Sequence, residues 1–131
     1  MGGWAIYAIV LLIVVVAAFL FSRRATSRKA SDAQVIEQLT KGGSNLTRPH
    51  NVQFRFYFPS RLSADRVTGT LRADGFQVSV EEVAQGNQYI VRVARSMVPL
   101  LSELQSRRSK FDELANREGG IYDGWSAEVV K

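Results

Sequence analysis

The residues of this 131-residue chain that could carry out chemistry are few and far apart. A hydrolase or transferase needs a nucleophile with a base, a pair of carboxylates or a metal ion. His50 is the only histidine, and its place beside Pro49 predicts a solvated loop residue. Glu81 and Glu82 are neighbours in a strand-like segment, so their carboxyl groups point to opposite faces and cannot act on one substrate. We therefore expect a protein that is not an enzyme and uses no cofactor.

The absence of cysteine and the spacing of the glycines exclude further kinds of functional site. The sequence has no cysteine, which excludes a disulfide framework, a thiol nucleophile and a cysteine-ligated zinc site. The pairs Gly42-Gly43 and Gly119-Gly120 lack the spacing of phosphate-binding loops. Each pair is better explained as the end of a helix.

Four residues near the C-terminus are candidates for binding a protein partner. Tyr122 and Trp125 flank Asp123 and Gly124, which together predict a bend in the backbone. Large amphipathic rings of this kind often anchor protein partners at interfaces. The alternative is that Trp125 fills the edge of the core and that the bend lets it do so.

A second set of residues would suit RNA. Arg55, Tyr57 and Arg92 are expected on the open face of a sheet, where RNA-recognition domains stack bases on aromatic side chains. The strand segment QYIVRVAR, however, lacks the signature of those domains. Of 17 basic residues, four lie between residues 23 and 29, which leaves 13 basic against 12 acidic residues in 30–131. This near-neutral balance gives little reason to expect binding to a phosphate backbone.

An apolar run without a charged side chain extends from residue 4 to residue 21. At about 1.5 Å per residue, a helix over this run spans roughly 27 Å, close to the ~30 Å hydrocarbon core of a bilayer. We predict a transmembrane helix over residues 1–22, with Trp4 near the outer headgroups, and a basic linker over residues 23–30. A cleavable signal peptide is the alternative, but its basic stretch would precede the apolar core.

The basic residues of the linker predict the orientation of the chain. Segments rich in Lys and Arg stay in the cytoplasm, so the N-terminus should lie outside and the rest of the chain inside. The same residues could instead sense anionic lipids, although a topology signal is the simpler explanation. They are Arg23, Arg24, Arg28 and Lys29.

Residues 31–131 have the size of one domain, and its first half shows clear local signals. Ser31 and Gln34 have the form of a capping box and predict a short helix over residues 32–41. Residues 51–58 alternate between apolar and polar types and predict a strand whose apolar face consists of Val52, Phe54, Phe56 and Phe58. A second helix, capped by Ser63, should end at Gly75.

The second half begins with two strand-like segments, residues 76–83 and 89–95. Between them Gly86 and Asn87 predict a hairpin loop. Pro99 should be the first residue of a long helix, because proline suits that position. The apolar side of this helix would hold Leu100, Leu101, Leu104, Phe111 and Leu114. A final strand follows, in which Asp123-Gly124 predicts a bulge.

Read in order, the elements after the leading helix are strand, helix, strand, strand, helix, strand. This order predicts an α+β domain with a ferredoxin-like sandwich, in which two helices cover one face of a four-stranded antiparallel sheet. The phenylalanine face of the first strand should pack under the helices, and Arg55 and Tyr57 should point away from them.

The C-terminal segment GIYDGW, residues 120–125, resembles the closing motif of the regulator of ribonuclease E activity B family. Other segments agree with that family: Phe56-Tyr57-Phe58, Leu71 with Gly75-Phe76, and the long helix that ends just before the motif. The resemblance covers roughly residues 31–130. It implies a ferredoxin-like domain without enzymatic activity, whose named member binds ribonuclease E and restrains RNA processing and decay.

This resemblance implies a role for the whole chain. We expect a bacterial inner-membrane protein that presents an interaction domain to the cytoplasm, with ribonuclease E or a related membrane-associated enzyme as the partner. A membrane-localised RNA-binding module is the alternative. The chain differs from the founding type of the family, which is markedly acidic and soluble, and Ser126 replaces a glycine that often follows the tryptophan.

Overall fold

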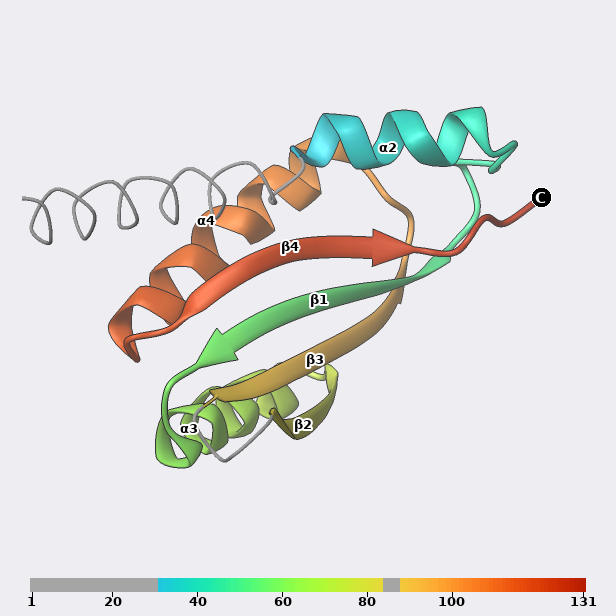
Figure 1. The fold of residues 1–131 in the computed structure, drawn as a ribbon. Coiled ribbons are helices and arrows are strands. Elements are labelled where there is room, and N and C mark those ends of the chain that lie inside the picture. Colours follow the sequence, from blue (N-terminus) through green and yellow to red (C-terminus); the bar gives the residue numbers. More distant parts are fainter. Residues whose placement is uncertain (1–30, 84–87) are drawn as a thin grey trace, which may run out of the picture. The chain divides into compact units, whose positions relative to one another are not determined.

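A computed structural model describes residues 31–83 and 88–131, which form three helices and four strands (Figure 1). The predicted transmembrane helix over residues 1–22, the basic linker over residues 23–30 and the hairpin-loop residues Gly86 and Asn87 lie outside this part. Within the described ranges, no helix combines the length and apolar character that crossing a membrane requires. The elements are α2 (Asp32–Lys41), β1 (His50–Phe58), α3 (Arg61–Ala73), β2 (Gln77–Val83), β3 (Gln88–Met97), α4 (Leu101–Arg117) and β4 (Ile121–Ala127).

The four strands form one sheet in the order β2-β3-β1-β4, and each neighbouring pair is antiparallel. The predicted α+β class and the predicted order of elements after the leading helix are therefore confirmed. Helix α3 links β1 to β2, and helix α4 links β3 to β4. Both helices cover the same face of the sheet, and α2 packs beside α4 and β4 (Figure 1).

The core lies between the sheet and the two covering helices. Phe54 and Phe56 of β1 contact Phe111 of α4, with ring centroids 5.0 and 5.1 Å apart. Such edge-to-face pairs add to the stabilisation from burial. The predicted apolar face of β1 is confirmed, because four side chains on it are at most 1% exposed: Val52, Phe54, Phe56 and Phe58.

The helix starts include one confirmed and one corrected prediction. The capping box of α2 is present: Gln34 N–H donates to Ser31 Oγ at 3.2 Å, and Ser31 N–H donates to Gln34 Oε1 at 2.9 Å. The cap of α3 is Ser60 rather than Ser63, since Ser60 Oγ accepts from the Ser63 N–H at 3.2 Å. The helix begins earlier because Pro59 ends β1 and leaves Ser60 extended, the conformation that an N-cap requires.

The start of α4 also differs from the prediction. Leu100 is the N-cap and makes no side-chain capping bond, so the helix begins at Leu101 and Pro99 precedes it. Leu100 and Leu101 are 54% and 40% exposed, so their predicted place on the apolar side is wrong. The first buried side chain of the helix is Leu104, and Pro99, which precedes the helix, is also buried.

Candidate functional site

The Tyr122–Trp125 segment forms the middle of β4 and contains the predicted bulge. Phe56 pairs with Tyr122 and Phe54 pairs with Trp125, so both Asp123 and Gly124 lie opposite the single residue between them in β1. Gly124 has φ +99°, a conformation that residues with a Cβ rarely adopt. In a regular strand, residues three apart point to opposite faces. The extra residue of the bulge brings Tyr122 and Trp125 to the same face, toward the core.

The turn between α4 and β4 positions this segment. The N–H of Gly120 donates to the carbonyl of Ala115 at 2.8 Å, which closes the end of α4. A Cβ on Gly120 would lie 2.3 Å from the ring of Phe58 and 2.5 Å from the carbonyl oxygen of Tyr57. Only glycine allows β4 to start this close to β1. Gly119-Gly120 therefore ends the helix, as predicted, and Gly120 also allows β4 to pack closely against β1.

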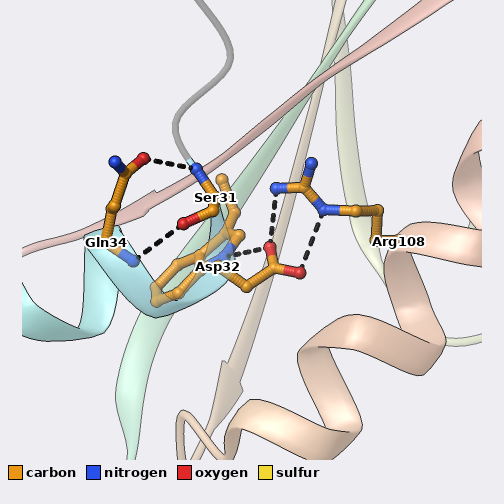
Figure 2. A network of polar contacts seen from close by, with 5 residues as sticks. Ser31, Asp32, Gln34 and Arg108 are labelled. Atoms are coloured by element: carbon orange, nitrogen blue, oxygen red, sulfur yellow. Dashed lines mark hydrogen bonds and ion pairs between the residues drawn. The ribbon is translucent and has the colours of Figure 1, made fainter.

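Arg108 and Trp125 both bind the buried carboxylate of Asp32, and Figure 2 shows Arg108 pointing toward that carboxylate. The indole Nε1–H of Trp125 donates to Asp32 Oδ1 at 3.0 Å. Arg108 donates to the same carboxylate twice, from Nε to Oδ2 and from Nη2 to Oδ1, both at 2.9 Å. Asp32 and Trp125 are 4% and 7% exposed. Bidentate guanidinium–carboxylate pairs of this kind are among the strongest polar contacts in proteins.

This cluster holds three elements together. Asp32 is in the first turn of α2, Arg108 is in α4 and Trp125 is in β4. The position of Asp32 is favourable because the N-terminus of a helix stabilises negative charge. The hydrogen bond to Asp32 also raises the pKa of Arg108, so the guanidinium stays charged. The cluster therefore attaches the leading helix to the domain.

Tyr122 lies deeper on the same side of β4. Its ring centroid is 5.2 Å from that of Phe56 and 5.4 Å from that of Phe111. Burial, reinforced by the nearby Asp32 carboxylate, raises the pKa of Tyr122 far above its ordinary value. The phenol therefore remains neutral throughout the physiological range.

The structure changes the interpretation of the four candidate partner-binding residues. Tyr122 is 2% exposed and Trp125 is 7% exposed, so neither ring offers a free surface to a partner. Gly124 is also buried, and Asp123 is partly exposed. The geometry agrees with the alternative that Trp125 fills the edge of the core and that the bulge lets it do so. Tyr122, Gly124 and Trp125 therefore build the fold, and contact of the partly exposed Asp123 with a partner stays a prediction.

The three residues predicted to face RNA do share one face of the sheet. Arg55 and Arg92 are directly opposite each other in the β1–β3 pair, and Tyr57 is two residues along from Arg55. Both arginines are exposed and Tyr57 is partly exposed. Arg92 also forms an ion pair with Glu81 at 2.9 Å. No helix of the described part of the chain covers this face (Figure 1).

His50 is not the solvated loop residue that the sequence predicts, because its side chain is 0% exposed. Its Nδ1 lies 2.7 Å from the carbonyl oxygen of Arg48, which can only accept, so Nδ1 carries the proton. Its Nε2 shares a hydrogen bond with the hydroxyl of Ser44, and Ser44 Oγ accepts from the Val130 N–H at 3.0 Å. Ser44 therefore links the buried imidazole to the C-terminal tail.

One set of predicted functional residues lies outside the part of the chain that the structure describes. The topology residues Trp4, Arg23, Arg24, Arg28 and Lys29 precede the described residues. Within residues 31–83 and 88–131, no group of three or more His, Asp or Glu side chains is arranged to hold a metal ion. The sequence reasoning missed Asp32 and Arg108, although Ser31 beside Asp32 signalled the start of the helix.

The fold and its contacts define a small α+β domain whose most distinctive residues build a buried polar cluster. Comparison with protein families adds the name of that class. The family described as "Regulator of ribonuclease activity B" matches residues 29–127. The chain therefore belongs to this family, and the resemblance found in its C-terminal motif is confirmed at the family level.

Comparisons with individual proteins add less. No curated protein matches the chain. Among solved structures, the peptidoglycan binding domain of the B. subtilis cell wall lytic enzyme CwlC is 17% identical, with a TM-score of 0.30. The alignment covers 62% of this chain and 91% of that domain. A likeness at this level carries no conclusion about the present chain.

Proposed function

We propose that this chain is a membrane-anchored, non-catalytic interaction domain of ferredoxin-like fold that regulates a ribonuclease by occupying a surface on a protein partner. The expected partner is ribonuclease E or a related membrane-associated enzyme. The family match over residues 29–127 carries this proposal. The compact unit Ser31–Lys131 supports an interaction domain that follows the predicted basic linker.

The membrane part of the proposal rests on the sequence. The run from residue 4 to residue 21 has no charge, and four basic residues follow between 23 and 29. This arrangement supports a single helix in the bacterial inner membrane, with the N-terminus outside and residues 31–131 in the cytoplasm. Protease added outside intact cells should leave the domain uncut, and protease added to inverted vesicles should digest it. Cleavage in intact cells would contradict this topology.

The partner is tested with the full chain extracted from membranes in mild detergent. We expect affinity capture to recover ribonuclease E or a related enzyme, and the purified full chain in lipid nanodiscs to slow cleavage of an RNA substrate by that enzyme. A chain truncated after residue 30 is the matched control, since it keeps the anchor and lacks the domain. Failure both to capture such an enzyme and to slow cleavage would refute the proposal.

RNA binding is the second candidate, favoured by the shared face of Arg55, Tyr57 and Arg92. Filter binding of labelled RNA to the full chain at two salt concentrations separates the two. A complex held by phosphate contacts must weaken steeply as salt rises. RNA retention with that salt dependence, together with unchanged ribonuclease activity, would favour the RNA-binding module.

A further inference from the structure

The uncovered face of the sheet carries two short rows of side chains that differ in character. In the first row, Tyr57 of β1 pairs with Ile90 of β3 on one side and with Ile121 of β4 on the other. Ile121 is 60% exposed, and Tyr57 and Ile90 are partly exposed. These three side chains, here called the apolar row, cross three strands. Directly paired residues of neighbouring strands point to the same face.

The second row, here called the arginine row, consists of Arg55 and Arg92, paired directly across β1 and β3. It lies two residues along each strand from the apolar row, which corresponds to about 7 Å. Like charges placed directly opposite each other destabilise a sheet. The charge of Arg92 is offset by Glu81, whereas the side chain of Arg55 makes no hydrogen bond or ion pair within residues 31–83 and 88–131. The row therefore carries positive charge that the described part of the domain does not neutralise.

We propose that this face binds an extended segment of the protein partner that presents a carboxylate to the arginine row and an apolar side chain to the apolar row. The proposal rests on the proposed function and names the surface through which it would act. In an extended peptide, alternate residues share a face and stand about 7 Å apart, which matches the separation of the two rows. An acidic residue followed two positions later by an aliphatic residue fits both.

The composition of the face favours a protein segment over a nucleic acid. Ile90 and Ile121 offer aliphatic surface, whereas bases bind best to flat aromatic or guanidinium planes. Glu81 stands on the same face beside Ile90 and Arg92, where it would repel a phosphate backbone. A single carboxylate reaching Arg55 meets less of this repulsion, since the ion pair already occupies Glu81.

The test uses the full chain in lipid nanodiscs and a fluorescent octapeptide of sequence Ser-Asp-Ser-Leu-Ser-Asp-Ser-Leu, with binding followed by anisotropy. This peptide should bind. Replacing both arginines (Arg55→Ala with Arg92→Ala), or replacing Ile121→Ser, should weaken binding by about tenfold or more, which corresponds to about 1.4 kcal/mol. The control variant Arg61→Ala removes an exposed arginine of α3 and should bind normally. Circular dichroism melts confirm that each variant is folded.

Three further probes identify what the face recognises. A peptide with Lys in place of Asp, and one with Ser in place of Leu, should each bind at least about tenfold more weakly. Octauridylate should not compete. The proposal is overturned if the acidic peptide fails to bind the unmodified chain, if the arginine variants bind it equally well, or if octauridylate binds more tightly in an Arg55-dependent way.

Capture and inhibition of the enzyme by the double arginine variant separate this proposal from the proposed function. If the double arginine variant captures the ribonuclease partner and slows it as the unmodified chain does, the partner uses another surface and only the inference fails. If the unmodified chain neither captures nor slows the enzyme, the proposed function fails whatever the peptide does.

Discussion

The two sides of the sheet place arginine in opposite settings. On the side that the helices cover, Arg108 of α4 donates two hydrogen bonds to the carboxylate of Asp32, a residue that is 4% exposed. On the open side, Arg55 is exposed beside Arg92, and the ion pair of Arg92 with Glu81 joins side chains that are 44% and 60% exposed. Solvent makes the difference. Exposed pairs contribute about 0–1 kcal/mol, whereas breaking a buried pair costs about 3–5 kcal/mol. One setting stabilises the fold, and the other leaves charge accessible to a partner.

The largest expected effect is on the covered side. Phe56→Ala should lower the free energy of unfolding by about 3–5 kcal/mol, because the ring is fully buried and its loss leaves a cavity. Gln53→Ala is the control, since this side chain is exposed on the other side of β1. Urea unfolding of the full chain in detergent micelles measures both. Similar losses for the two variants would show that the two sides are wrongly assigned.

The next effect concerns the polar cluster. Arg108→Met should cost about 3 kcal/mol, at the lower end for a buried pair because Arg108 is itself partly exposed. Arg117→Met on the same helix removes only an exposed pair with Glu113 and should cost about 0.3–0.5 kcal/mol. The same unfolding experiment compares them. Equal small losses would mean that the buried carboxylate is satisfied without Arg108.

A smaller effect appears at high pH. The folded-state pKa of Tyr122 is raised, so the folded chain holds its phenolic proton after the unfolded chain has lost it. Stability should therefore be fully present below about pH 10 and should fall above it by about 1.4 kcal/mol per pH unit. Tyr122→Phe should remove this slope. Unfolding curves of both proteins between pH 9 and about 11 provide the test, and parallel slopes would contradict it.

The smallest expected effect is on the open side. Arg55→Thr should change the free energy of unfolding by about 0.5 kcal/mol or less, and in the stabilising direction, because it relieves the repulsion from Arg92. Differential scanning calorimetry of the variant and the unmodified chain measures the change. A decrease in the free energy of unfolding of more than about 1 kcal/mol would show that Arg55 stabilises the fold and would contradict a role confined to partner binding.

Local signals in the sequence predicted most of the fold. The capping box of α2, the alternation of β1 and the Asp123-Gly124 bulge each depend on residues close together in the chain. For Trp125 the sequence predicts either the edge of the core or an interface with a partner, and the structure shows it buried. The hydrogen bond from Trp125 to Asp32 spans 93 positions, and the hydrogen bond from Arg108 to Asp32 spans 76. No local pattern in the sequence predicts either contact.

The wrong predictions for His50, Leu100 and Leu101 also arise from contacts between residues far apart in the sequence. His50 has the sequence neighbours of a loop residue, whereas in the fold it is buried and contacts Ser44, which also binds Val130, 86 positions away from Ser44. Leu100 and Leu101 fit the periodicity of α4, but periodicity does not show where the neighbouring elements stop covering a helix. Residue type and alternation predict that Arg55 and Arg92 lie on the open face, whereas their direct pairing depends on the register of two strands.

The bulge in β4 has one more consequence. This strand is the last of its sheet, and an outermost strand presents unpaired backbone groups to which a strand from another molecule can add. The bulge bends β4, and Asp123 adds a negative charge to it, so another strand pairs poorly with this edge. The extra residue that turns Tyr122 and Trp125 inward thereby also discourages neighbouring copies from joining edge to edge into aggregates.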